Sequence, residues 1–255
     1  MDALVVATLV FVGLFGGACA GMWGARKLKE DHLTKETQEA VKLGVGMVAA
    51  MASLILGLMT ASVKGNFDAT SKDVQQYATY LITLDLALRH YGPGADPARA
   101  ALVDYTRHAI AETWPDTAGP DTEAKVASAD SEQRLSAVGQ HIRTFAPATS
   151  EQTDLKSEAL ERYKALSALR WVLIAESSTQ VPTVFIAVIV VWLTLIFVSF
   201  GLFAPVNAVS IIVFLLCGVS LGGAIFIILE MSTPFDGIII VSPEAMQGAL
   251  RHMLR

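Results

Sequence analysis

One window of 53 residues, 177–229, contains no Asp, Glu, Lys or Arg, and it limits the possible folds more than any other feature of the chain. A helix needs roughly 20 residues to cross a bilayer, so this window is too long for one crossing and suits two. Gly201 and Pro205 lie near its middle, where a tight turn would join the two crossings. We predict a transmembrane hairpin with helices at 182–203 and 206–229.

Two shorter uncharged windows lie near the start of the chain, at 3–23 and 44–63, and each suits one crossing. The second window is bracketed by Lys42 and Lys64. Small residues around Cys19 resemble a signal-peptide cleavage site, but no positive charge precedes the first window. We therefore expect an uncleaved first helix, and four membrane crossings in all.

The overall composition agrees with a membrane protein. Hydrophobic residues make up 53% of the chain and charged residues 17%, whereas a soluble domain carries about 25% charged residues. The formal net charge of -5 argues against nucleic acid as a partner. Both cysteines, Cys19 and Cys217, lie in apolar runs, which excludes a disulfide-based fold. The expected partner is the lipid bilayer.

The segment 64–181 carries most of the charge, with 12 basic and 16 acidic residues. Within it, side chains recur at alternating steps of three and four, the spacing of one helix face. The three series are Val74, Tyr77, Leu81, Leu84, Leu88 and Tyr91; Leu135, Val138, Ile142 and Phe145; and Leu155, Ala159, Arg162, Leu166, Leu169 and Leu173. A further helix is predicted from Pro97 to Trp114. These faces pack either within the chain or against another subunit.

No stretch of useful length alternates like a β-strand, so we predict an all-α fold. The predicted architecture is a four-transmembrane-helix membrane protein with a helical extramembrane bundle inserted between helices 2 and 3. Its parts are the first two membrane helices at 1–63, the bundle at 64–181, the transmembrane hairpin at 182–229 and a C-terminal tail at 230–255.

The C-terminal tail contains two turn signals. Pro234, Phe235, Asp236 and Gly237 predict a turn at the membrane interface, with a positive φ at Gly237. This turn either sets the fold or acts as a gate or ligand-binding turn. Further on, Ser242 predicts the N-cap of a short helix, because a proline follows it at the first helical position.

Small residues recur along the predicted membrane helices, most regularly in the second one. Such residues let helix backbones approach closely in lipid, and the alternative is a pore lining of small and hydroxyl side chains. The candidate seam for either role consists of Gly46, Ala50, Ser53, Gly57 and Thr60.

None of the four predicted membrane helices carries an ionisable residue in its core. Proton pumps and ion-coupled carriers usually keep one there, so the pattern favours a passive pore over a proton-coupled carrier. Charges lie instead where helices leave the membrane, and they are either interface anchors or part of a conduction path. The candidates are Lys42, Lys64, Arg170, Glu176 and Glu230.

No enzyme motif is present: the chain has no P-loop, dinucleotide fingerprint, HExxH, CxxC or nucleophile elbow. The five histidines have no metal-ligand spacing with one another. We predict no catalytic residues, no metal and no cofactor. Asp85 is expected to form a structural ion pair with an arginine of the returning helix, such as Arg162 or Arg170.

Several longer motifs resemble a bacterial family of bestrophin-like integral membrane proteins, defined by a domain of unknown function. The resemblance covers nearly the whole chain, and its most specific marks follow the last membrane helix. The motifs are His32 to Thr37, Val41 to Gly46, Leu54 to Leu58, Lys64, Phe67, Asp68, Leu84, Asp85, Tyr91 to Pro93, Arg170, Trp171, Pro182, Glu230 to Gly237, and Val241 to Glu244.

This resemblance implies an oligomeric anion channel with four membrane helices per subunit and a large cytoplasmic domain. The acidic cluster and aromatic neck typical of bestrophins are not visible here. Charge counting favours the opposite orientation, because five Lys or Arg residues lie in the loop 24–42. On that count the segment 64–181 is periplasmic.

The leading hypothesis is a homo-oligomeric protein of the bacterial inner membrane that forms a passive pore for inorganic anions. The alternative is a membrane-anchored helical scaffold, sensor or accessory assembly protein that conducts no ions.

Overall fold

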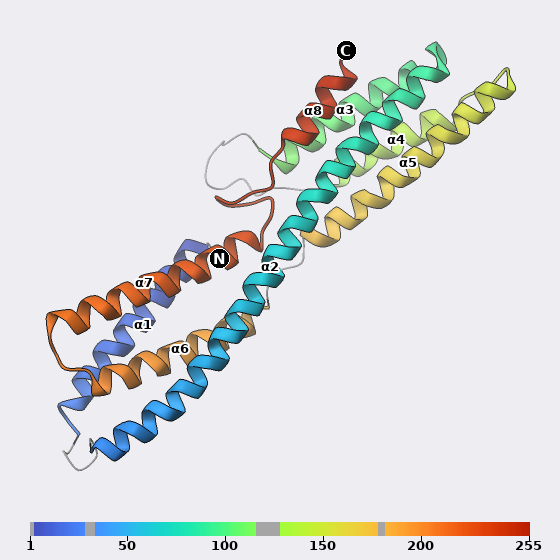
Figure 1. The fold of residues 1–255 in the computed structure, drawn as a ribbon. Helices are drawn as coiled ribbons and strands as arrows, with labels where there is room; N and C mark the ends of the chain where they lie inside the picture. The colour runs from blue at the N-terminus through green and yellow to red at the C-terminus, as the bar shows by residue number, and fades with distance from the viewer. Residues whose placement is uncertain (1–2, 29–33, 116–127, 178–181) are drawn as a thin grey trace. The chain divides into compact units, whose positions relative to one another are not determined.

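In a computed structural model, residues 3–28, 34–115, 128–177 and 182–255 are described. All regular elements in these residues are helices (Figure 1). They are α1 (Ala3–Ala25), α2 (Lys35–Tyr91), a 3₁₀ turn (Pro93–Ala95), α3 (Asp96–Thr113), α4 (Ala129–Arg143), α5 (Ser150–Ser177), α6 (Thr183–Phe203), α7 (Ala208–Met231) and α8 (Glu244–Met253). The predicted all-α fold is confirmed for the described part of the chain. The predicted loop at 115–130 lies largely outside it.

The chain divides into two compact units. The first comprises residues 1–65 and 180–232, and the second comprises 66–179 and 233–255. Helix α2 belongs to both, because it runs without interruption through residue 65. Four helices are long and apolar enough to cross a membrane, namely α1, α2, α6 and α7.

In the first unit, α1 packs against α6 and α7 (Figure 1). Its contact with α6 is made by the backbones themselves, since a Cβ on Gly21 would lie 2.2 Å from the carbonyl oxygen of Val198. On α7, a Cβ on Gly218 would lie 3.3 Å from the ring of Phe11. Lipid provides no hydrophobic drive between helices, so such close approach supplies the packing. Small residues of α1, α6 and α7 therefore act as helix–helix contacts.

The second unit is a bundle in which α3 packs against α4 and α8, and α4 against α5. Every apolar residue of the first two predicted series is buried, so these faces pack within the chain. In the α5 series Arg162 is exposed, whereas Ala159, Leu166 and Leu173 are buried. Helix α2 ends before Gly92, whose φ of 97° is readily adopted by glycine alone.

A buried carboxylate joins the α2 and α3 regions of this bundle. Asp85 is fully buried and accepts hydrogen bonds from Nε of Arg89 at 2.7 Å and Nε of Arg99 at 3.0 Å. The expected partners on the returning helix, Arg162 and Arg170, are wrong. Arg89 lies one turn along the same helix and Arg99 near the start of α3, so both reach Asp85 locally.

Helix α8 begins at Glu244, and its N-cap is Pro243 rather than the predicted Ser242. The hydroxyl of Ser242 still accepts a hydrogen bond from the backbone N–H of Glu244 at 3.3 Å. One face of α8 enters the core of the second unit through Met246, Ala249 and Met253.

Candidate functional site

The membrane part of α2 has one packed face and two open faces. The packed face contributes to the core of the first unit through Val45, Val48, Ala52, Ile55 and Met59. A helix turns about 100° per residue, so the predicted seam falls on a second face and large apolar residues on a third. The large ones are Leu43, Met47, Met51, Leu54 and Leu58, all exposed. We call these two open faces the small-residue face and the large-residue face.

All five residues of the small-residue face are exposed: Gly46, Ala50, Ser53, Gly57 and Thr60. A Cβ added to Gly46 or Gly57 would meet no atom within 4 Å. The hydroxyl of Thr60 donates to the carbonyl of Leu56 at 2.8 Å, which satisfies its donor inside the helix. Unlike Gly21 and Gly218, the two glycines of this face therefore have no close neighbour among the described residues. Ser53 lies at its edge, where it lines a cavity of about 410 Å³ between α2, α6 and α7.

The five predicted interfacial charges are divided between the two units. Lys42, Lys64 and Glu230 belong to the first unit, and Arg170 and Glu176 to the second. Lys42 is exposed beside a cavity of about 210 Å³ between α2 and α6, and Lys64 is also exposed. Glu230, at the end of α7, is buried.

Arg170 lies inside the bundle and is only 6% exposed, so it is not an interfacial anchor. Its Nη2 donates to the carbonyl of Ser128 at 3.3 Å. Within the described part of the chain, no carboxylate forms an ion pair with it. A buried cation is costly without compensation, so its surroundings matter.

Arg170 lines a cavity of about 40 Å³ in the second unit, together with the hydrogen-bonded phenols of Tyr77 and Tyr105. Burial raises the pKa of Tyr77 well above its ordinary value, and the Tyr105 phenol adds to the rise. Burial likewise raises the pKa of Tyr105, although its hydrogen bond to Tyr77 and the charge of Arg170 oppose the rise. Both phenols therefore stay protonated at neutral pH. A water needs roughly 10–15 Å³ of such space, so the cavity suits waters or a small anion.

The predicted turn closes one side of this cavity. The ring of Phe235 is buried and meets the ring of Trp114 edge to face at 5.7 Å. The backbone N–H of Val241 donates to the carbonyl of Pro234 at 2.8 Å, which closes the turn. Gly237 has a φ of 100°, as predicted. Pro234 is buried and Asp236 exposed. Phe235 is therefore part of the core of the second unit.

Sequence reasoning missed this cavity. Tyr77 was expected only as one member of an apolar series, and Tyr105 was not selected at all. The two phenols are 28 residues apart on different helices, and no spacing rule connects them. The one available signal was Arg170 itself. It directly follows Leu169 of the α5 series, and a basic residue beside a buried helix face needs a polar partner there.

The fold and the open face of α2 define a class: an all-α membrane protein with four apolar helices and an extramembrane helical bundle. The model of the Bestrophin-like domain matches residues 12–246, and the chain belongs to this family. No protein of curated function matches the sequence.

Solved structures share this fold. A variant of a bacterial bestrophin homologue from Klebsiella pneumoniae superposes with a TM-score of 0.71 at 14% identity, covering 100% of this chain and 97% of its own. A second variant of a Klebsiella pneumoniae homologue gives 0.67 at 15% identity, with 97% of each chain covered. A structure described as a membrane protein gives 0.65 at 14% identity, covering 96% of this chain and 97% of its own. At these identities the likeness is one of fold.

Proposed function

We propose that the protein is an oligomeric, passive ion channel in which α2 of each subunit lines the pore and inorganic anions are conducted. The observation that carries the proposal is the open small-residue face of α2. Its five residues are all exposed, and a Cβ on either of its glycines would meet no described atom within 4 Å.

The burial of the membrane helices supports an assembly of several copies. Only 6% of the apolar window of α2 is buried, against 22% to 28% in α1, α6 and α7. A single helix cannot enclose an aqueous path, so a ring of identical subunits would place one open face of each α2 around an axis. The large-residue face would then contact lipid or the neighbouring subunit, and the small-residue face would face water.

The charges favour anions. The membrane part of α2 carries no ionisable side chain, and the first charged residue at either end is a lysine, Lys42 or Lys64. Uncharged pores select ions through dipoles and hydroxyls, while charges at the mouths set the local ion concentration. Kinship with bestrophins, known as anion channels, supports the same choice. A bacterial inner membrane and a periplasmic bundle remain predictions.

The first test is reconstitution of the full-length protein into liposomes with a chloride gradient and a fluorescent chloride reporter. Chloride release well above that of empty liposomes is expected. Equal release from both, across a range of pH and voltage, would contradict the channel and favour the anchored scaffold. Sodium release in place of chloride release would contradict the anion assignment alone.

The second test locates the pore with two neighbouring cysteines in a background lacking Cys19 and Cys217. Ser53→Cys lies on the small-residue face, and Leu54→Cys lies at the same depth on the large-residue face. A charged, water-soluble thiol reagent is expected to block flux through Ser53→Cys and to leave Leu54→Cys unaffected. Block of Leu54→Cys alone would assign the pore to the large-residue face instead.

A further inference from the structure

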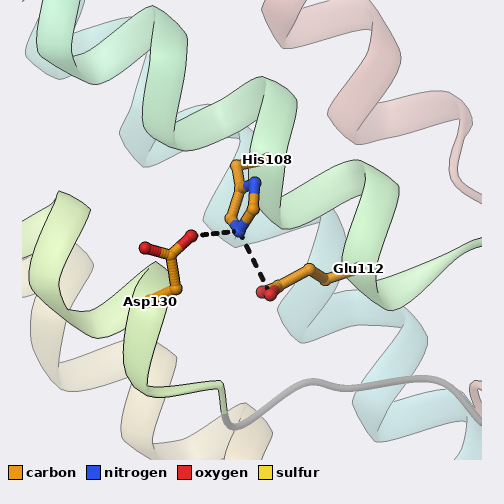
Figure 2. Close-up of side chains that lie close together, drawn as sticks. All are labelled: His108, Glu112 and Asp130. Carbon is orange, nitrogen blue, oxygen red and sulfur yellow. Dashed lines mark ion pairs between the residues drawn. The ribbon is translucent and has the colours of Figure 1, made fainter.

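Three potential metal ligands converge on one point of the extramembrane bundle. His108 and Glu112 lie four residues apart on α3, and Asp130 lies in the first turn of α4 (Figure 2). The Nε2 atom of His108 is 2.6 Å from Oδ2 of Asp130 and 3.1 Å from Oε1 of Glu112. Figure 2 shows the imidazole nitrogen between the two carboxylates. One donor atom from each residue lies within 4.8 Å of the other two.

The imidazole nitrogen is shielded from water and lies between two carboxylates. Nε2 of His108 has almost no surface in water, and it pairs with Oδ2 of Asp130 and Oε1 of Glu112 only when the imidazole is protonated. When Nε2 carries no proton, three acceptor atoms face one another with no donor between them. A cation bound by all three side chains would take the place of that proton.

Neighbouring side chains hold both carboxylates in place. The hydroxyls of Ser128 and Ser131 donate to the far oxygen, Oε2, of Glu112, the latter at 2.6 Å. This leaves Oε1 directed at His108. Nε of Arg134 donates to Asp130 at 2.9 Å. Such outer partners orient ligands in metal sites and fix their protonation state.

The local charge is negative. Arg134 forms ion pairs with Asp130 and Asp104. Glu112 accepts hydrogen bonds from Ser128 and Ser131 and has no guanidinium partner among the described residues. The cluster therefore contains three carboxylates and one guanidinium, which leaves a double negative charge when His108 is neutral.

We propose that His108, Glu112 and Asp130 bind one divalent transition-metal ion, with Zn²⁺ as the best-fitting example. One imidazole nitrogen and two carboxylate oxygens form a mixed N/O ligand set, which suits Zn²⁺ or Mn²⁺ better than Ca²⁺ or Mg²⁺. Three protein ligands leave a position for water, and the half-exposed Asp130 carboxylate gives the ion a route from solvent. The bound ion would join α3 to α4 and neutralise the local charge.

Individual substitutions at the three positions test the site. Isothermal titration of tag-free, chelator-treated full-length protein in detergent with ZnCl₂ is expected to give one strong site per chain. His108→Ala, Glu112→Gln and Asp130→Asn are each expected to weaken that site about tenfold or more. His141→Ala, at an exposed histidine of α4, is the matched control and should bind like the natural protein.

Two outcomes would overturn the proposal: no saturable Zn²⁺ binding, or binding that His108→Ala leaves unchanged. Equal affinity for Ca²⁺ would overturn the choice of metal class. Helical circular dichroism of each variant checks its folding. If one substitution unfolds the bundle, X-ray absorption of the natural protein with Zn²⁺ still decides, since one imidazole among oxygen ligands is expected. A shell with no imidazole would contradict the site.

Discussion

The carbonyl oxygen of Ala18 and the α-carbon of Gly201 touch, so that a Cβ on Gly201 would lie only 2.1 Å from that oxygen. No side-chain rearrangement relieves such an overlap, because both partners are backbone. Gly201→Ala is therefore expected to push α1 and α6 apart and to lower the stability of the first unit by about 1–3 kcal/mol. Thermal unfolding in detergent measures the change.

Gly223→Ala is the matched control for this substitution. Gly223 lies in α7, also within the apolar region, and a Cβ there would meet no atom within 4 Å. Its melting temperature is expected to equal that of the natural protein or to exceed it slightly, since alanine favours helix. Equal losses in both variants would mean that the close contact of α1 and α6 contributes nothing specific.

Removing the buried carboxylate of Asp85 is expected to destabilise the second unit. Asp85→Ala leaves Arg89 and Arg99 without their shared partner, and breaking a buried ion pair costs about 3 kcal/mol or more. Both arginine side chains keep about a quarter of their surface in water, 30% and 27%, which limits the loss to the lower end. Chemical denaturation followed by circular dichroism measures it, with Asp154→Ala on the exposed face of α5 as control.

Trp114→Phe tests the closure of the extramembrane cavity. The indole N–H of Trp114 donates to the carbonyl of Val241 at 2.8 Å, and phenylalanine keeps most of the ring but not the donor. The loss of one hydrogen bond is expected to lower stability by about 1 kcal/mol. The same change at the exposed Trp171 is expected to have little effect. A larger loss at Trp171 would disagree with this account.

The raised pKa of Glu176 predicts that the stability of the second unit depends on pH. Burial raises the pKa of its carboxyl, a hydrogen bond with Thr70 opposes the rise, and Asp73 adds to it. A carboxyl with a raised pKa in the folded state stabilises the fold below its ordinary pKa, and the contribution is lost as pH rises through the raised value. Glu176→Gln is always neutral, so it is expected to melt above the natural protein at about pH 7.5 and together with it at about pH 4.

The control for the pH experiment is Glu161→Gln, at an exposed position of α5. Its melting temperature is expected to follow that of the natural protein at both pH values. If Glu176→Gln and Glu161→Gln shift alike at neutral pH, the cause is the net charge of the chain rather than the burial of Glu176.

Hydropathy and heptad spacing predicted the helices well, because burial in lipid or in a bundle imposes a strict period on the sequence. The hairpin at 182–203 and 206–229 matches α6 and α7 closely. The start of α2 was less predictable. An uncharged window indicates which residues lie in the lipid, but it does not indicate where the helix begins. Helix α2 begins at Lys35, well before its uncharged window.

Individual polar contacts were much less predictable than helices. The partners of Asp85 depend on how a sharp turn at Gly92 brings the start of α3 beside α2. Asp130 and His108 lie on different helices, α4 and α3, so no local spacing in the sequence predicts that they meet. Only part of this cluster follows a sequence spacing: His108 and Glu112 are four residues apart on one helix. Whether the small-residue face lines a pore depends on other subunits, which one sequence does not describe.

The extramembrane unit is built from two stretches of the chain, 66–179 and 233–255, and the second supplies Phe235, Val241 and Met246 to its core. A ribosome makes this second stretch only after α7. Until then the bundle lacks part of its core and exposes apolar surface of the kind that chaperones and proteases recognise. Completion of the bundle therefore requires that all four apolar helices have already been synthesised, and a chain truncated within α7 cannot complete this core.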